Sequence, residues 1–595
     1  MSTSPRTPRS FFPVDLTPLL LTGWQTNKFD GSIPFWAEVN NLQFTETSIK
    51  RKPGRTLIGS TGGSVIRGMQ STLEYDTKVL YVGDLTSIYA WRQNEPTIFN
   101  DVVGTSYNLV ENAGSTLWDA AEGGSTWDVA EGGSTWDDGI AVSSVWSFTN
   151  FGTWVLAADD VGPIKIKKNN ETFAELLSGK ISGVNITTAG SGHAVGDTLT
   201  FSGGSGSNFA AKVTQVSNGA VTRLRVTNYG LGYANLDSLT QGSTSGSGTS
   251  LVVQATIPDC TFTRVKAIDK SGPHILAINY DEGSLKSPYD VAWSAEDDPD
   301  TWVASATNAA GSLTLREASS ELACITPLGE AKAIYTQDQM FILNYIGAPF
   351  YFGYETAMAS GVGAVSPKSV VPVNRLNYGL SRNGVFMTDG NSVTDIGNKE
   401  GINSWLKQNV SSNDYPKISA VHNQENNEVI WYLPVNSSTV NTELSYNYAT
   451  GVFSKSYNSN VNISEAMTAG TFIHNITADS SGNVYFEDGG PSSHNTLGLT
   501  KAHDLEDPYS VKELTSIRVG KTGTGSPQVR IGWANNIDDE PTFNPNDTFL
   551  VGDKFKEFNI RTSGRYLFLE VSSTANTDNW EITNMLIKGR IRGFR

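Results

Sequence analysis

Residues 265–280 read VKAIDKSGPHILAINY, and this stretch decides the fold class. Two apolar runs flank the triplet Ser271-Gly272-Pro273. Short apolar runs on either side of Ser, Gly and Pro residues are typical of a β-hairpin, because these residues accept the backbone angles of a tight turn. The stretch therefore predicts two antiparallel strands joined by a turn.

The same pattern recurs along the chain, with no convincing long amphipathic helix between its copies. Hairpins repeating at roughly 40–60 residues favour a β-propeller of about six to eight blades. A sandwich or barrel would use fewer and longer strands. Many copies are needed because one blade cannot bury both of its faces alone. The other hairpins are predicted at 79–91, 145–168, 333–345, 376–396, 420–434 and 475–489.

Two segments interrupt this pattern. Residues 178–256 are rich in Gly, Ser and Thr, and NITTAGSGHAVGDTLT (185–200) matches RVTNYGLGYANLDSLT (225–240) at a period of 40. This predicts a small duplicated β domain inserted into the propeller. Residues 501–595 alternate apolar and polar residues in several runs, which predicts a C-terminal β-sandwich. The fold class predicted is therefore all-β.

The predicted organisation has five parts. Residues 1–75 are an irregular or strand segment that joins the propeller, although WAEVNNLQFTETSIKRKPG (36–54) indicates two short strands stopped by Pro53-Gly54. The propeller blades occupy 76–177 and 257–500, on either side of the insert at 178–256, and the sandwich occupies 501–595.

Composition limits the class of function. The 595-residue chain has 38% hydrophobic residues, only 17% charged residues and 58 glycines, which suits many short strands joined by turns. Its net charge of −17 disfavours a grip on nucleic acid by phosphate neutralisation, but an acidic surface lets such a polymer pass without sticking. The apolar run at 11–24 is too interrupted for a signal peptide and too short to span a bilayer. Cys260 and Cys324 are expected to be buried free thiols rather than a disulfide framework.

Residues 114–138, GSTLWDAAEGGSTWDVAEGGSTWDD, place Trp118, Trp127 and Trp136 nine residues apart. A calcium-binding solenoid would need a third glycine where this repeat has Thr and Trp, and a Trp-Asp propeller blade would need a period of about 40 residues. The preferred interpretation is a strand-and-turn patch with its rings on one face. Such a patch is either core or a contact between subunits.

No catalytic motif stands out. The chain lacks a Gly-x-Ser-x-Gly elbow, a His-Glu-x-x-His pair, a Walker loop and a Cys pair at metal spacing, so neither catalytic residues, a metal nor a cofactor is predicted. The acidic run AEDDPD (295–300) is interpreted as a solvated turn between Trp293 and Trp302, with a calcium loop or a carboxylate pair as alternatives.

Basic residues gather at the C-terminal end, KGRIRGFR (588–595). Lys588, Arg590, Arg592 and Arg595 are interpreted either as a solvated tail or as a strand that docks on an acidic neighbour. The cluster Lys50-Arg51-Lys52 presents the same alternatives.

Five stretches in order resemble a family of bacteriophage tail proteins, the nozzle or tail hub proteins of short-tailed phages. They are distributed between residues 40 and 590, outside 100–260. They are NNLQF…SIKRKPG (40–54), YDVAWSAEDDPDTWV (289–303), ITPLGEAKAIYTQDQMFILNYIGAPFYFGYE (325–355) with GAVSPKSVV (363–371), GLSRNGVFMTDGNSVTDIG (379–397), and GRYLFLEVSS…WEITNMLIKGR (564–590).

The resemblance implies a structural virion protein and not an enzyme. In that family six copies form a ring below the adaptor protein, and the ring's channel conducts double-stranded DNA during ejection without binding it specifically. It implies contacts with the adaptor or tail tube and with a tail fibre or spike, no membrane partner, and a location in the virion tail after assembly in the host cytoplasm. A tail adhesin that binds host glycans and a propeller glycosidase remain the alternatives.

Overall fold

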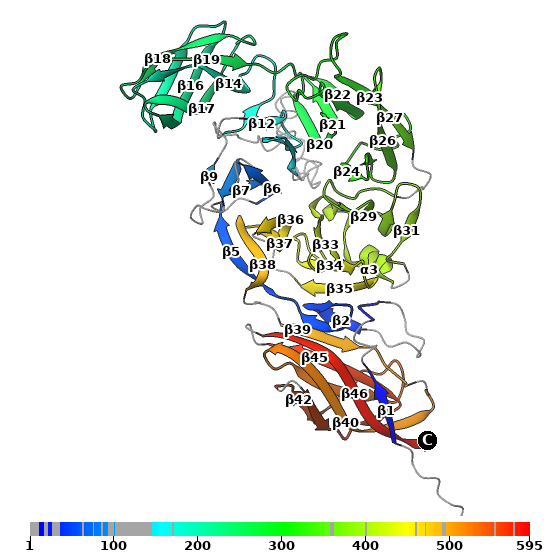
Figure 1. Ribbon diagram of the computed structural model, residues 1–595. Helices are drawn as coiled ribbons and strands as arrows, with labels where there is room; N and C mark the ends of the chain where they lie inside the picture. Colours follow the sequence, from blue (N-terminus) through cyan, green and yellow to red (C-terminus); the bar gives the residue numbers. More distant parts are fainter. Residues whose placement is uncertain are drawn as a thin grey trace, which may run out of the picture.

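The computed structural model describes residues 11–16, 22–26, 36–61, 65–74, 77–84, 87–92, 100–101, 145–168, 172–356, 362–398, 401–457, 461–469, 472–490, 495–505, 507–552, 555–574 and 578–594. These residues form three bodies: a propeller, an insert at one end of the molecule, and a sandwich at the opposite end (Figure 1). Almost all regular structure is strand, as predicted. Within the described residues, a short helix, α3 (Ile402–Asn409), and a 3-10 turn, η2 (Ser412–Lys417), lie in the connection between two blades.

Seven four-stranded antiparallel sheets make up the propeller within the described residues. Each of the seven predicted hairpins falls in a different one of these sheets, so the hairpin prediction is confirmed. The sheets are β6 (Gly68–Glu74), β7 (Thr77–Gly83), β8 (Ile88–Arg92), β9 (Asn100–Asp101); β10 (Ser147–Phe151), β11 (Trp154–Ala158), β12 (Lys165–Lys167), β13 (Ala174–Glu175); β20 (Arg264–Ser271), β21 (His274–Glu282), β22 (Leu285–Trp293), β23 (Gly311–Thr314); β24 (Cys324–Leu328), β25 (Ala331–Tyr335), β26 (Met340–Gly347), β27 (Tyr351–Thr356); β28 (Val370–Val373), β29 (Leu376–Ser381), β30 (Gly384–Thr388), β31 (Val393–Asp395); β32 (Ser419–Asn423), β33 (Glu428–Leu433), β34 (Thr442–Asn447), β35 (Val452–Tyr457); and β36 (Val461–Ala469), β37 (Phe472–Asp479), β38 (Asn483–Gly490) with β5 (Gly54–Ser60).

The first strand of each sheet lies innermost, and these strands contact one another in the closed order β6, β10, β20, β24, β28, β32, β36 and back to β6. The ring is completed by β5, which comes from the N-terminal part of the chain and pairs antiparallel with β38. A strand from one end of the chain thus completes the blade made by the other end, and this pairing joins the two ends of the ring.

The second strand of a blade is the most apolar because neighbouring blades cover both of its faces. In β21 the seven residues from His274 to Tyr280 are all buried, and in β33 every residue is buried. Sheets stacked face to face remove apolar surface from water. Each Å² of apolar surface buried in this way stabilises the fold by about 25 cal/mol, and this is the main stabilising contribution.

The insert at 178–256 forms a six-stranded sheet in the order β14-β19-β18-β15-β16-β17. Its halves share local geometry as well as sequence. The Asp197 carboxylate accepts a hydrogen bond from the Ala194 N–H (3.0 Å), and the Asp237 carboxylate accepts one from the Ala234 N–H (2.9 Å). The predicted duplication is therefore present in three dimensions. The strands are β14 (Gly183–Ser191), β15 (Thr198–Ser202), β16 (Ser207–Ser217), β17 (Ala220–Leu231), β18 (Ser238–Thr244) and β19 (Thr249–Thr256).

The sandwich contains a seven-stranded sheet built on β40 and β46 and a five-stranded sheet in the order β2-β39-β45-β41-β42. One apolar cluster fills the sandwich and continues into the propeller, where Trp431 of β33 and Phe453 of β35 belong to it. The sandwich strands are β1 (Phe11–Asp15), β2 (Trp36–Asn40), β3 (Leu42–Phe44), β4 (Ile49–Arg51), β39 (Thr496–Thr500), β40 (Ser510–Thr524), β41 (Gln528–Ala534), β42 (Thr542–Leu550), β43 (Phe555–Asn559), β44 (Ser563–Gly564), β45 (Tyr566–Ser573) and β46 (Asn579–Phe594).

Two predicted boundaries need correction. Residues 1–75 do not form one joining segment, because β1 to β4 belong to the sandwich, β5 closes the last blade and β6 begins the first blade at Gly68. The sandwich begins at β39 (Thr496–Thr500), before the predicted limit of 501. β1, β2, β5 and β39 pair with strands far away in the sequence and so carry no local signal of their neighbours, whereas β6 pairs with the adjacent strand β7.

Candidate functional site

The axis of the propeller contains a cavity of about 340 Å³, lined by residues from all seven innermost strands. Polar side chains in its wall include Asp269, Lys368 and Glu465. Burial raises the pKa of Glu465 to about 7, while the charge of Lys368 acts in the opposite direction. Asp269 is paired with Lys332 Nζ at 2.5 Å. The axis is thus a narrow, polar cavity rather than a wide channel.

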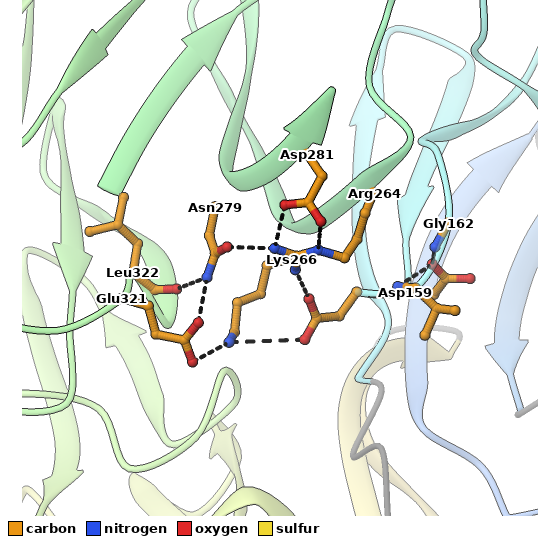
Figure 2. A network of polar contacts seen from close by, with 10 residues as sticks. Asp159, Gly162, Arg264, Lys266, Asn279, Asp281, Glu321 and Leu322 are labelled. Carbon is orange, nitrogen blue, oxygen red and sulfur yellow. Dashed lines mark hydrogen bonds and ion pairs between the residues drawn. The ribbon is translucent and has the colours of Figure 1, made fainter. Parts of the chain in front are cut away.

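A network of charged side chains joins three neighbouring parts of the propeller (Figure 2). Arg264, at the start of β20, donates two hydrogen bonds to Asp281 (2.9 and 3.0 Å), one to Asn279 Oδ1 (2.7 Å), and one to Asp160 in the turn after β11. Asp159 in that turn accepts hydrogen bonds from the Val161 and Gly162 N–H groups. Arg264 therefore fastens one blade to the next.

The network continues through Lys266, which lies 3.3 Å from Glu321 and 3.9 Å from Asp160 (Figure 2). Asn279 Nδ2 donates to Glu321 Oε2 (3.2 Å) and to the Leu322 carbonyl (3.1 Å), just before β24. Burial raises the pKa of Asp160 despite Lys266 and Arg264. Burial also acts to raise the pKa of Glu321. The charge of Lys266 and the hydrogen bond from Asn279 outweigh this effect, so the pKa of Glu321 is lowered. The carboxylates are occupied by side chains of the fold, so the network is structural.

The segment 40–54 clamps the sandwich to the propeller. Asn41 Nδ2 donates to the Asn495 carbonyl (2.9 Å), at the start of the sandwich. On the other side, Gln43 Nε2 donates to Glu428 Oε2 of β33 (2.8 Å), and Lys52 is paired with Glu443 of β34. Polar side chains therefore join the two bodies across a seam that also contains apolar side chains of both.

Two charged groups in this seam are far from their ordinary pKa values. Burial raises the pKa of Glu428 to about 7, although Lys52 and the Gln43 hydrogen bond act against this change. Burial lowers the pKa of Lys52 despite the acidic groups around it. Charges this deep are tolerated only when they are paired, as Lys52 is with Glu443.

The predicted contact residues fall into two groups. Trp118, Trp127, Trp136 and Arg595 lie outside the described residues. Lys588, Arg590 and Arg592 lie on β46, which is a strand of the sandwich and not a free tail.

These three residues are brought together with acids of their own chain. Arg590 Nε donates to Glu513 at 2.6 Å, Arg592 donates to the same carboxylate at 2.7 Å, and Lys588 lies 3.2 Å from Glu557. Hydrogen bonds from Arg590 and Arg592 lower the pKa of Glu513 to about 2. A contact of these three residues with another subunit would have to form while they remain paired with Glu513 and Glu557.

The acidic run 295–300 forms a turn between two buried rings, Trp293 and Trp302. Asp298 accepts hydrogen bonds from the Asp300 N–H (3.0 Å) and the Thr301 hydroxyl (2.7 Å). Asp300 is buried rather than solvated, and it pairs with Lys168 and accepts a hydrogen bond from the Ser182 hydroxyl (3.1 Å). The sequence did not reveal this role because its partners are more than a hundred residues away.

The two thiol groups of the chain are buried in the fold. Cys260 and Cys324 are free and buried, as expected, and burial raises the pKa of each thiol to about 12. In the part of the chain that the structure describes, no three His, Cys, Asp or Glu residues are grouped in a way that could hold a metal ion. Nor do the described residues include a helix long and apolar enough to cross a membrane.

The fold defines an all-β propeller protein with an inserted β domain and a terminal sandwich. Comparison of the sequence with family models gave no match, and comparison with curated proteins gave none either. Among solved structures the chain is similar to an ancestral GH74 enzyme at 9% identity and a TM-score of 0.24, over 78% of this chain and 63% of that one. A likeness this weak carries no argument about activity.

Proposed function

We propose that this chain is a structural virion protein, the tail nozzle or hub subunit of a short-tailed bacteriophage. Six copies form a ring whose channel conducts double-stranded DNA during ejection and which carries other tail parts. The proposal starts from the five ordered sequence stretches that resemble this family. It gains support from the place of the first of them in the fold.

The clamp at residues 40–54 is the observation that carries the proposal. Its polar side chains bind the sandwich and the propeller at once, and one apolar cluster runs through both bodies. The wall of a conduit must keep its shape while a stiff polymer slides past it. A subunit whose two main bodies share a core meets that requirement, because packed interiors deform little.

The passage for DNA is proposed to lie between copies and not along a propeller axis. The axial cavity of about 340 Å³ has the volume of a sphere roughly 9 Å across, which is narrower than the major groove of DNA alone at about 12 Å. A net charge of −17 suits such a passage, because an acidic wall repels phosphates and keeps friction low.

Contacts between copies need apolar surface, and the turn between β26 and β27 offers some. Tyr345 and Ile346 at the end of β26 and Phe350 in the turn are 48, 57 and 70% exposed, within one of the stretches that carry the resemblance. Contiguous exposed apolar groups mark interaction surfaces. We include this turn among the proposed subunit contacts, beside Trp118, Trp127 and Trp136.

The test is a cryo-EM reconstruction of phage particles that encode this chain. Six copies around the tail axis, below the adaptor, are the expected result. Mass photometry of the purified chain with its adaptor should show the same stoichiometry. A particle that lacks the chain, or a channel wall dominated by lysine and arginine, would refute the proposal.

A further inference from the structure

A cavity lies between the insert and the propeller. It measures about 780 Å³ and is lined by residues of β14, β16 and β17 on one side and by Trp154, Lys168 and Asp300 on the other. This volume falls within the range of roughly 300–1,000 Å³ in which small ligands are bound. Neither the proposed conduit nor any contact described above requires it.

The insert is fixed firmly enough to give this cavity a defined shape. The Thr172 hydroxyl donates to the Val226 carbonyl (3.2 Å), and the Tyr229 hydroxyl donates to the Phe173 carbonyl. At the floor, Lys168 is buried and bound to both Asp300 and the Ser182 hydroxyl. Because these buried residues bind one another, the cavity has a defined wall on this side and is not a gap between loosely placed domains.

Two sheet edges face the cavity. Within the described residues, β14 pairs only with β19 and β17 only with β16, so each leaves one edge without a strand partner. Lining positions Gly183 and Val184 correspond to Arg223 and Leu224 at the 40-residue period, which places the cavity where the two halves of the duplication meet. Unpaired edges carry backbone N–H and C=O groups that can bind a polar ligand.

The geometry argues against an added peptide strand. Parts of β14 and β17 approach within 8 Å between Cα atoms. A strand inserted between them would need about 4.8 Å on each side, or roughly 9.6 Å in total. The seam is too narrow for that where the strands meet.

The lining favours a ligand that has both hydroxyl groups and an apolar face. Asn185, Gln215 and Thr222 offer amide and hydroxyl groups, while the Trp154 indole offers an aromatic surface. The Lys168 ammonium lies over that ring, 5.1 Å from its centre, so a ligand that stacks on Trp154 must use the opposite face of the indole. An apolar ligand would leave the amides unpaired at a cost, whereas a pyranose ring places C–H groups on an aromatic face and hydroxyl groups on its rim.

We infer that this cavity is a binding site for a short oligosaccharide, with Trp154 as its stacking platform and Asn185, Gln215 and Thr222 as its hydrogen-bonding groups. The ligand class follows from the cavity alone. The saccharide site and the nozzle function are therefore independent proposals, and each can be refuted without the other.

The experiment uses the purified full-length chain on an array of bacterial surface oligosaccharides. A trisaccharide prepared from the strongest positive glycan is then titrated by calorimetry. We expect Gln215→Ala to weaken binding by about tenfold, which is the effect of losing one ligand hydrogen bond in a partly closed site. Thr222→Trp, at an exposed position of β17, should place a bulky ring against the Asn185 and Gln215 side of the cavity and strongly weaken binding.

Thr227→Ala is the matched control, because Thr227 is exposed on the same strand but does not line the cavity. It should bind like the unchanged chain, and circular dichroism should show the same fold for all variants. The inference is overturned if no saccharide binds to the folded chain, or if Thr222→Trp binds as well as Thr227→Ala does. A chain that binds sugar but is absent from virions would refute only the nozzle.

Discussion

Replacing Arg264 with methionine removes the central cation of the network in Figure 2 while keeping an unbranched apolar side chain of similar length. Four hydrogen bonds disappear, and the Asp160 and Asp281 carboxylates, whose side chains are only 22 and 13% exposed, lose their strongest donor. A buried polar group that loses its partner costs about 1–3 kcal/mol. Partial exposure lets water replace some of the loss, so we expect a total near 3 kcal/mol.

The assay is hydrogen–deuterium exchange measured peptide by peptide, because a chain of several bodies has no single unfolding free energy. A loss of about 3 kcal/mol corresponds to roughly a hundredfold faster opening, and it should be confined to β20, β21 and the turn after β11. Peptides of the sandwich should not change. Arg316→Met is the control, since Arg316 is exposed in the connection between the same blade and the next.

The pH dependence gives a second readout. Burial already raises the pKa of Asp160, and loss of Arg264 should raise it further. A carboxyl with a raised folded pKa is favoured in its neutral form, so the defect should shrink as the pH falls from 8 toward 5. Equal exchange rates in Arg264→Met and Arg316→Met, or a defect that does not depend on pH, would refute the account of the network.

Three further changes have defined outcomes. The folded pKa of Glu428 is about 7 and its ordinary value is 4.5, so stability should fall as the pH rises between these values. Glu428→Gln should remove that slope in thermal melts, and an unchanged slope would contradict the assignment. Cys260 and Cys324 should stay unreactive toward a thiol reagent at pH 8 until the chain is denatured, because burial raises the pKa of both thiols to about 12, and rapid labelling of the native chain would be inconsistent with their burial. Deleting residues 588–595 should destabilise the sandwich itself, since β46 pairs there with both β1 and β40, and a folded sandwich of unchanged melting temperature would show that those pairs are dispensable.

The sequence was sufficient to predict those elements whose strands and turns are close together along the chain. The Ser271-Gly272-Pro273 turn joins β20 and β21 as predicted, with Gly272 at a positive φ of 57° that glycine adopts without strain. The seven hairpins and the duplicated insert are units of this kind. Their strands and turns lie close together in the sequence, so hydrophobic patterning and turn residues specify them.

The features that could not be predicted depend on residues that are far apart in the sequence and meet only in the folded chain. The segment 54–60 has a weak strand pattern, and its neighbour β38 lies at 483–490. Gln43 and Glu428 are 385 residues apart, and Lys168 and Asp300 are 132 apart. No turn chemistry links such pairs, so the clamp, the buried acidic residue and the cavity beside the insert emerge only when the fold is known.

The closing strand β5 also imposes an order of events during synthesis. About 430 residues separate it from β38, and at about 5–20 residues per second the ribosome needs roughly 20–90 s to deliver the partner. Throughout this time the first blades exist with an open edge, and the N-terminal strands of the sandwich wait even longer. The nascent chain is therefore exposed to edge-to-edge aggregation until translation is nearly finished. Conditions that slow elongation should lower the yield of soluble protein more than conditions that slow initiation.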